Sequence, residues 1–302
     1  MIRAFVPDDV PAAAALLVER HHQHRLESPL LAPLEQAAAE AAVTALVDGL
    51  GGAVAVEGSE VTGYLLARTR DGAWGPNAWV EAAGCAGQRL PELYARCAAD
   101  WVAAGLTAHY ALVPPSLTET FVRLTFGLMH VHGAQPTPTG WSDPRVRRGT
   151  PDDIPVLADL DLTFQAHFPR SPIFSAMTQE TREALNEEWA STWDDGYEVW
   201  VAEVDGAVGG YLIGCDLSKS GANAGLPSPV KAGHLATAAV FPAYRGQGLA
   251  RALTGTFATW AADAGYPTVC SDWRSANLEA DRTWRGLGFV PTFHRMHRHV
   301  GY

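Results

Sequence analysis

The two halves of the 302-residue chain repeat the same order of sequence patterns, and this repetition constrains the fold more than any other feature. Ile2-Arg3 is followed by Pro7-Asp8-Asp9-Val10-Pro11, and Val146-Arg147 is followed by Pro151-Asp152-Asp153-Ile154-Pro155. In both copies a short strand leads into a turn whose aspartates can cap a helix, and an apolar-periodic stretch follows. The repeat predicts two domains with one element order.

A pair of hairpin patterns extends the repeat. Residues 54–65 (VAVEGSEVTGYL) match residues 201–212 (VAEVDGAVGGYL). Each segment predicts two strands joined by a short turn, which lies at Gly58-Ser59 in the first copy. In the second copy the turn lies at Asp205-Gly206.

A third pair of segments predicts the last helix of each half. Residues 121–128 (FVRLTFGL) match residues 282–289 (RTWRGLGF). Each is typical of a helix that ends one residue before a glycine, Gly127 or Gly288, with a strand following.

The segment between the halves, residues 135–144 (QPTPTGWSDP), is rich in proline and small polar residues, as expected of a linker. We therefore predict two domains, at residues 1–140 and 145–302. Helices that interleave with strands predict α/β layers, with helices flanking a sheet in each domain.

Composition limits the partners of this chain. The formal net charge of −11 repels the phosphates of nucleic acids and anionic membrane surfaces, so we expect neither as a partner. No apolar run approaches the roughly 20 residues that a membrane-spanning helix needs. The N-terminal residues MIRAFVPDDV lack the pattern of a secretory signal, which leads us to expect a cytoplasmic protein.

Metal-ligating residues are scattered. The cysteines occur singly, without a CxxC pair, and are expected to be reduced thiols. They are Cys85, Cys97, Cys215 and Cys270. The pairs His130/His132 and His297/His299 could each put two imidazoles on one strand face, but no third convergent ligand is evident. We expect no metal site.

The segment His234–Leu253 (HLATAAVFPAYRGQGLARAL) carries the most specific pattern in the chain. Small, β-branched and apolar residues through Val240 predict a buried strand, which Pro242 ends because proline cannot donate to a sheet. A turn with two glycines then leads into an apolar-periodic helix.

This arrangement predicts an anion site. Gly246 and Gly248 allow backbone N–H groups to converge, and the start of the helix adds unpaired N–H groups and partial positive charge. Arg245 and Arg251 can add full charge. A nucleotide-binding P-loop would need a lysine, and a Rossmann turn would need Gly or Ala where Arg251 stands.

At this point the sequence resembles the GNAT superfamily of N-acetyltransferases. The family's Gln/Arg-x-x-Gly-x-Gly/Ala signature, after a strand ending V-x-P, is met by Arg245, Gly248 and Ala250 after Val240-Phe241-Pro242. A second signature, an Asn-x-x-Ala-x-x-x-aromatic helix that closes on Gly-Phe, is met by Asn277, Ala280, Trp284, Gly288 and Phe289. The resemblance covers about residues 145–302, and the repeat carries it faintly into the first half.

The resemblance implies a fold and a cofactor site. It implies two tandem GNAT-like domains, each a mixed, mostly antiparallel sheet flanked by helices. It also implies that acetyl-CoA is the acyl donor. Backbone groups of Ala238 and Val240 would pair with the pantetheine arm as an added strand does. Asn277 would contact the cofactor or cap its helix. The pyrophosphate would be held by Arg245, Gly246, Gln247, Gly248, Leu249 and Ala250, with Arg251 beside them.

The chemistry of amine acylation requires a base, because an ammonium group has no lone pair to attack a thioester. The family often uses a glutamate on this strand, and His234 stands at that position. A neutral imidazole suits the task, although a histidine at the start of a strand can also be chemically idle. Asp272 and Ser271 are further candidates. Trp284 stands where the family often has a tyrosine that acts as the general acid. An indole cannot release its proton at neutral pH.

The first half keeps the element order but not the motif. Residues 78–90 (AWVEAAGCAGQRL) contain no Arg-x-x-Gly-x-Gly/Ala spacing, so we expect this domain to have lost the cofactor. Paired halves with one degenerate copy resemble the architecture of the mycothiol synthases.

The resemblance implies transfer of an acetyl group from acetyl-CoA to a primary amine of a small molecule. Two other interpretations remain open. The acceptor could be a protein N-terminus or a lysine side chain, or the chain could be a non-catalytic acyl-CoA sensor.

Overall fold

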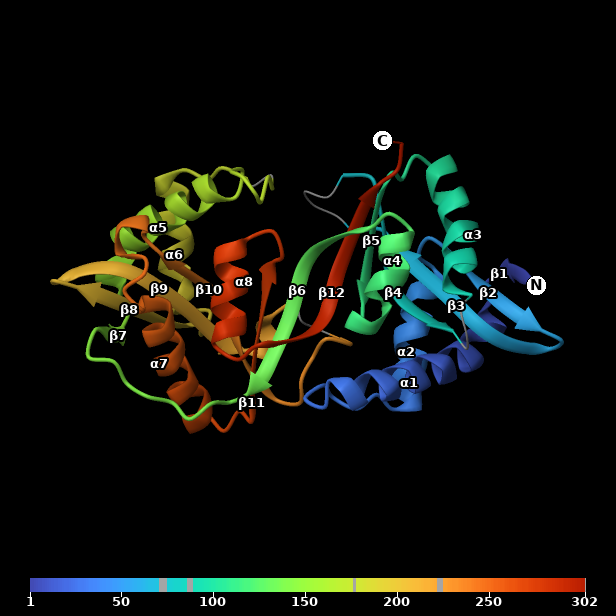
Figure 1. Cartoon of the computed structure of the whole chain (residues 1–302), viewed down its shortest axis with the longest axis horizontal. Helices are drawn as coiled ribbons and strands as arrows, with labels where there is room; N and C mark the ends of the chain where they lie inside the picture. Colours follow the sequence, from blue (N-terminus) through green and yellow to red (C-terminus); the bar gives the residue numbers. More distant parts are fainter. Residues whose placement is uncertain (71–74, 86–88, 176–177, 222–224, 302) are drawn as a thin grey trace. The chain divides into compact units, whose positions relative to one another are not determined.

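The computed structural model describes residues 1–70, 75–85, 89–175, 178–221 and 225–301 (Figure 1). Its contacts divide the chain into two compact units, Met1–Val131 with Pro291–Tyr302 and His132–Val290. The last strand therefore belongs with the first unit. The assignment of domains to residues 1–140 and 145–302 stays a prediction. Part of the segment predicted to have lost the motif, residues 86–88, lies outside the described residues.

The first unit is a sheet covered by helices on both faces. Its strand order is β1-β2-β3-β4-β5-β12, and β6 begins in this unit and ends in the second. Helix α3 covers one face, where Gly63 abuts Leu93, and α1 covers the other, where Gly84 abuts Leu16. The elements are β1 (Ile2–Ala4), α1 (Val10–Glu27), α2 (Gln36–Val47), β2 (Gly52–Glu57), β3 (Glu60–Arg68), β4 (Asn77–Cys85), α3 (Leu90–Ala103), β5 (Ala108–Val113), α4 (Thr118–Arg123), β6 (Gly127–Pro136) and β12 (Val290–His299).

The second unit repeats this plan with strand order β11-β10-β9-β8-β7. Helix α7 covers one face, where Gly214 and Gly233 abut Phe257. Helices α5 and α6 cover the other face, where Tyr211 contacts Asp161. The elements are β7 (Val146–Arg148), α5 (Ile154–His167), α6 (Arg182–Thr192), β8 (Glu198–Val204), β9 (Ala207–Asp216), β10 (Ala232–Val240), α7 (Leu249–Asp263), β11 (Thr268–Arg274) and α8 (Leu278–Gly286).

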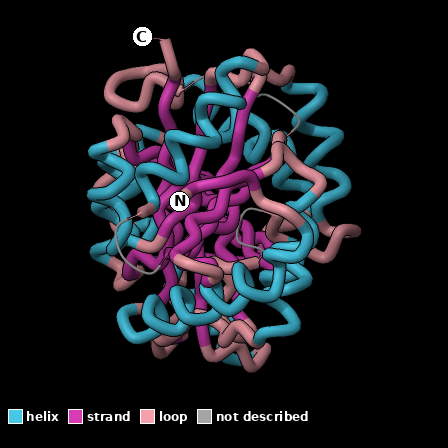
Figure 2. The backbone as a smooth tube through the Cα atoms, turned by 90° about the vertical axis from the view of Figure 1, so that its right-hand side faces the viewer, coloured by secondary structure: helices cyan, strands magenta, loops and turns pink. Residues whose placement is uncertain are grey.

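The layers agree with the predicted α/β class. Figure 2 shows the strands on the inside and the helices outside them. The strands pair in parallel at β4–β5 and β10–β11, and antiparallel at β1–β2, β2–β3, β3–β4, β5–β12, β7–β8, β8–β9 and β9–β10. The predicted hairpins are confirmed, since β2 turns into β3 at residues 58–59 and β8 turns into β9 at residues 205–206. Asp205 and Gly206 both have positive φ, at 52° and 78°, as this tight turn requires.

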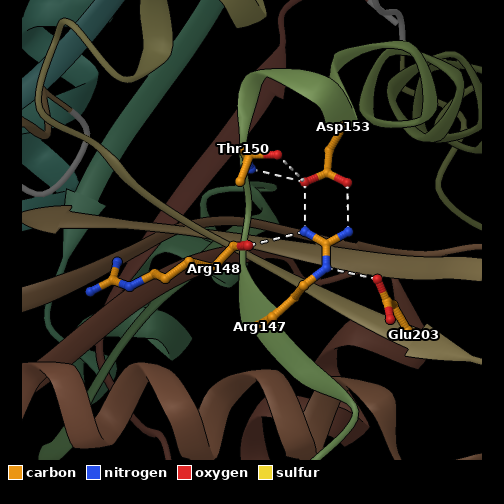
Figure 3. A network of polar contacts seen from close by, with 5 residues as sticks. All are labelled: Arg147, Arg148, Thr150, Asp153 and Glu203. Atoms are coloured by element: carbon orange, nitrogen blue, oxygen red, sulfur yellow. Dashed lines mark hydrogen bonds and ion pairs between the residues drawn. The ribbon is translucent and has the colours of Figure 1, made fainter. Parts of the chain in front are cut away.

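The Pro-Asp-Asp turns form the predicted helix starts, and each one also holds the arginine of the preceding strand. In the second unit both carboxylate oxygens of Asp153 accept hydrogen bonds from the guanidinium of Arg147 at 2.8 Å, and one accepts from the Thr150 N–H at 2.8 Å (Figure 3). Arg147 Nε also donates to Glu203 at 2.7 Å. Arg3 and Asp9 repeat the fork in the first unit at 2.7 Å.

The prediction for the last helix of the first half is wrong in detail. Helix α4 ends at Arg123 and does not extend to the residue before Gly127. Thr125 adopts the left-handed conformation, with φ of 64°, that Gly288 adopts after α8 with φ of 99°. A helix stop therefore exists in both units, but the first unit builds it without glycine.

Two absences complete the description. Among the described residues, no helix is long and apolar enough to cross a membrane. The same residues contain no group of three or more His, Cys, Asp or Glu side chains that could hold a metal ion. All four cysteines are free thiols, and Cys97, Cys215 and Cys270 are buried.

The Arg147–Asp153 fork yields a stability prediction. We expect Asp153→Asn to lower the free energy of unfolding by about 1–3 kcal/mol at pH 7, because an amide carries no charge and has only one acceptor oxygen, so that its NH2 group would face an N–H donor of Arg147. The Arg147 guanidinium holds the pKa of Asp153 below its usual range. The contribution is therefore present above about pH 4 and is lost as the pH falls through the lowered pKa.

Urea unfolding of the variant and the native chain checks this prediction. The control is Glu203→Gln, which removes only the half-exposed ion pair of Arg147 and should cost less than about 1 kcal/mol. Equal losses in the two variants, or a difference for Asp153→Asn that persists at strongly acidic pH, would contradict the assignment.

Candidate active site

The central strand of the second unit loses one neighbour partway along its length. β10 and β11 pair in parallel at Ala232, Gly233 and His234, and the pairing ends there. On its other edge β10 stays paired with β9 as far as Val240. Backbone groups on one edge of β10 after His234 are therefore available to a ligand that lies along the strand.

The point where the strands part is fixed by a bulge and a hydroxyl. The register between β9 and β10 shifts between Leu235 and Thr237. The carbonyl of Leu235 accepts a hydrogen bond from the buried Ser271 hydroxyl of β11 at 3.0 Å. A bulge turns the strand locally, so it helps β10 to diverge from β11.

The strand with the free edge, β10, leads into a turn whose backbone N–H groups could bind an anion. Gly246 and Gly248 both have φ of 78°, a conformation that glycine adopts at little cost. Helix α7 starts at Leu249 with Gly248 as its N-cap residue and no side chain capping it. The N–H groups of its first turn are thus left for an acceptor, and the helix dipole favours a negative one.

The strand and the turn line one cavity of about 610 Å³ in the second unit. Helix α8 forms another wall, and the end of α5 adds Leu160, Thr163, Phe164 and His167. The lining includes nine of the predicted cofactor residues, namely Ala238, Val240, Arg245, Gly246, Gly248, Leu249, Ala250, Arg251 and Asn277. Gln247 and His234 are not among the lining residues.

Arginine gives this cavity a positive character in an acidic protein. Arg245, Arg251 and Arg282 all line it, against Glu279 as the carboxylate. Arg245 Nη1 donates to Glu279 at 2.7 Å, so this arginine links the glycine turn to α8. Both side chains are exposed, and such a pair contributes little stability, so an anionic ligand can compete for Arg245.

The residues around this cavity match a known protein family. Residues 164–289, which include the open strand, the glycine turn and α8, match the model of the acetyltransferase (GNAT) family. These residues form a GNAT acetyltransferase domain. No curated protein matches the chain in sequence.

Solved structures extend the likeness of the fold beyond the GNAT domain. A GCN5-related N-acetyltransferase from Sphaerobacter thermophilus is 16% identical with a TM-score of 0.57, covering 99% of this chain and 95% of that one. A tandem GNAT protein from the clavulanic acid biosynthesis pathway is also 16% identical, with a TM-score of 0.50, covering 100% and 99%. At this identity the likeness concerns the fold, and it agrees with the expected tandem GNAT-like architecture.

Asn277 and Trp284 of the second GNAT signature each combine a structural role with a place in the cavity wall. The Asn277 side chain accepts from the Ala280 N–H at 3.2 Å, so it caps α8 while also lining the cavity. Trp284 is 8% exposed, packs edge-on against Phe289 with ring centroids 5.9 Å apart, and also walls the cavity.

His234 is the last residue of β10 that pairs with β11, and it is 6% exposed. Its neighbour Gly233 faces α7, so the imidazole points to the opposite face, where its Nδ1 lies 3.8 Å from Cys215 Sγ. Burial lowers the pKa of His234, and the charge of Asp272 on β11 opposes that shift. The imidazole is therefore neutral at pH 7.

Arg145, which no sequence pattern singled out, supports the glycine turn. Arg145 Nη1 donates to the carbonyl of Gln247 at 2.9 Å, while its other nitrogens hold Asp143 at 2.9 and 2.7 Å. The guanidinium lowers the pKa of Asp143 to about 2, so the pair stays ionised near neutrality. The acid–arginine spacing at residues 143–145 was the available signal.

The glycine turn can be tested with matched substitutions. We expect Gly248→Ala to weaken binding of coenzyme A by about tenfold or more, because a Cβ at φ of 78° shifts the N–H groups that follow. Gly265→Ala is the control, since Gly265 has φ of 72° but follows the other end of α7. Both variants should lose similar stability. Calorimetry showing equal affinities for coenzyme A would refute the role of this turn.

Proposed function

We propose that the chain is an N-acyltransferase that moves an acetyl group from acetyl-CoA to a primary amine of a small molecule. The observation that carries the proposal is the continuity of one cavity along the unpaired edge of β10 to the uncapped start of α7. An elongated ligand with amide groups at one end and a diphosphate beyond them fits such a surface.

The residues fit acetyl-CoA at each part. Backbone groups at Ala238 and Val240 suit the amides of the pantetheine arm. The turn at residues 245–250, with Arg251, suits the diphosphate, and Gln247 would contribute its backbone. Asn277 would contact the cofactor from the start of α8. Bound acetyl-CoA would supply the activated acetyl thioester.

The chain must accept a proton from the amine and stabilise developing negative charge. His234, neutral and beside the point where β10 and β11 part, is our candidate base, acting directly or through water. Backbone N–H groups of β10 near Val240 are candidates for hydrogen bonds to the carbonyl oxygen. Because Trp284 cannot act as an acid, the departing thiolate would take its proton from solvent, which suits a thiol of ordinary pKa near 8.5.

The other parts of the proposal follow from sequence. We also propose that the enzyme is cytoplasmic. A net charge of −11 supports a cationic or neutral acceptor and disfavours nucleic acid and anionic membranes as partners. The absence of the glycine motif supports a first domain that does not bind acetyl-CoA. Transfer to a protein N-terminus or lysine, and acyl-CoA sensing without turnover, are the alternative functions.

A screen of the purified chain with acetyl-CoA against small amines and peptides tests the proposal. We expect thiol release with one or more small primary amines, and none with their N,N-dialkylated analogues, which lack a replaceable proton. Release only with peptides would favour the protein-modifying alternative. Binding of coenzyme A without release across both panels would favour the sensor.

The base can be tested once an acceptor is known. We expect His234→Gln to lower kcat/KM by about 100-fold or more while leaving the affinity for coenzyme A nearly unchanged. Because burial lowers the pKa of His234, the native enzyme should lose activity only below pH 6.5. Asp272→Asn removes a charge that raises this pKa, and should move the acid limb to still lower pH. A rate unaffected by His234→Gln would eliminate His234 as the base.

A further inference from the structure

The first unit contains a half-buried arginine, Arg20, whose Nε and Nη2 atoms are fully buried and whose charge has no counterion among the described residues. Arg20 on α1 donates one hydrogen bond, from Nη1 to the carbonyl of Ala83 on β4 at 2.5 Å. Its Nε and Nη2 atoms are buried and have no hydrogen-bond partner, and no ion pair to Arg20 is found in the described parts of the chain. Burial lowers the pKa of Arg20, yet a guanidinium keeps its proton at any physiological pH.

A second unsatisfied donor lies beside it. Tyr64 on β3 is 0% exposed, and its hydroxyl has no partner among the described residues. The ring of Tyr64 lies against Gly84, the neighbour of Ala83, and the charge of Arg20 opposes the rise in the Tyr64 pKa that burial causes. In the second unit the equivalent Tyr211 is satisfied, because its hydroxyl donates to Asp161.

The repeat places this cluster where the second unit has its cavity. Arg20 follows the Pro-Asp-Asp turn at the same distance as Phe164, which lines the cavity. Ala83 pairs with Leu65 as Ala238 pairs with Leu212, so the carbonyl that Arg20 binds corresponds to the backbone of Ala238. Arg20 therefore occupies, in the first unit, the strand edge that is open in the second.

The free groups of Arg20 and Tyr64 can all donate, and the buried Nδ1 of His21 and both ring nitrogens of His24 also have no partner among the described residues. Nε and Nη2 form the side edge of the guanidinium, two parallel N–H groups that match the two oxygens of a carboxylate. A buried and unpaired charge destabilises the fold, and a bound anion would offset that cost. We propose that Arg20 and Tyr64 form a binding site for the carboxylate group of a small molecule in the first unit.

The local charge favours a monoanion. His21 and His24 are buried next to Arg20, and burial together with Arg20 lowers the pKa of both, to about 4 for His24. Both imidazoles are thus neutral at pH 7, and Arg20 contributes a single positive charge. A carboxylate balances that charge, whereas a phosphate dianion would leave a buried negative charge.

Titration of the full chain with acetate tests the site. At constant pH and ionic strength, with saturating coenzyme A in the second unit's cavity, replacing chloride by acetate should raise Tm in a saturable manner. Phosphate should give a smaller shift. Arg20→Lys, which keeps the charge but lacks the fork, should weaken acetate binding by about tenfold or more. Tyr64→Phe should weaken it by a smaller factor.

Arg96→Lys is the matched control, because Arg96 is an exposed residue paired with Asp100 and should leave the acetate response unchanged. An unresponsive native chain, a stronger response to phosphate than to acetate, or an undiminished response in Arg20→Lys would each overturn the proposal. If Arg20→Lys does not fold, the comparison of acetate, chloride and phosphate on the native chain decides alone. The result is independent of whether the second unit turns over any amine.

Discussion

The parting of β10 from β11 after His234 is the constraint on which the rest of the second unit depends. Backbone N–H and C=O groups inside a protein must find partners, and β10 gives up those of one edge over its last residues. Ser271 donates to the carbonyl of Leu235 at the point where the two strands part. Further along, water or a ligand must serve, and the cavity between α5, α7 and α8 makes room for one.

The sequence was most informative where structure is local. The Pro-Asp-Asp turns, the hairpins and the glycine turn each depend on residues close in the chain, and each was found where its pattern predicted. The stop of α4 was misplaced because Thr125 takes the left-handed position that sequence rules reserve for glycine. The partner of the last strand was also beyond reach. Its alternation indicates which face is buried, but not that His294–His299 pair with β5 of the first unit.

The same limit applies to the site. The turn at residues 245–251 could be predicted, because its positive φ angles require glycines and these stand directly before an apolar-periodic helix. Phe164 and His167 could not be placed in the cavity, since α5 lies far away in sequence and its apolar periodicity predicts burial without naming a neighbour. Arg145 was hidden for the same reason, as only the folded chain brings its guanidinium to the Gln247 carbonyl.

Comparison of the arginines in the two units separates a structural role for Arg20 from a binding one. Two arginines with a structural role, Arg147 and Arg3, each donate two hydrogen bonds to one carboxylate. Their partners are Asp153 and Asp9. Arg20 donates from Nη1 to a carbonyl, whereas its buried Nε and Nη2 have no hydrogen-bond partner. Buried N–H groups without acceptors destabilise a protein. The unpaired nitrogens of Arg20 beside the unpaired hydroxyl of Tyr64 therefore point to a bound ligand that accepts from them.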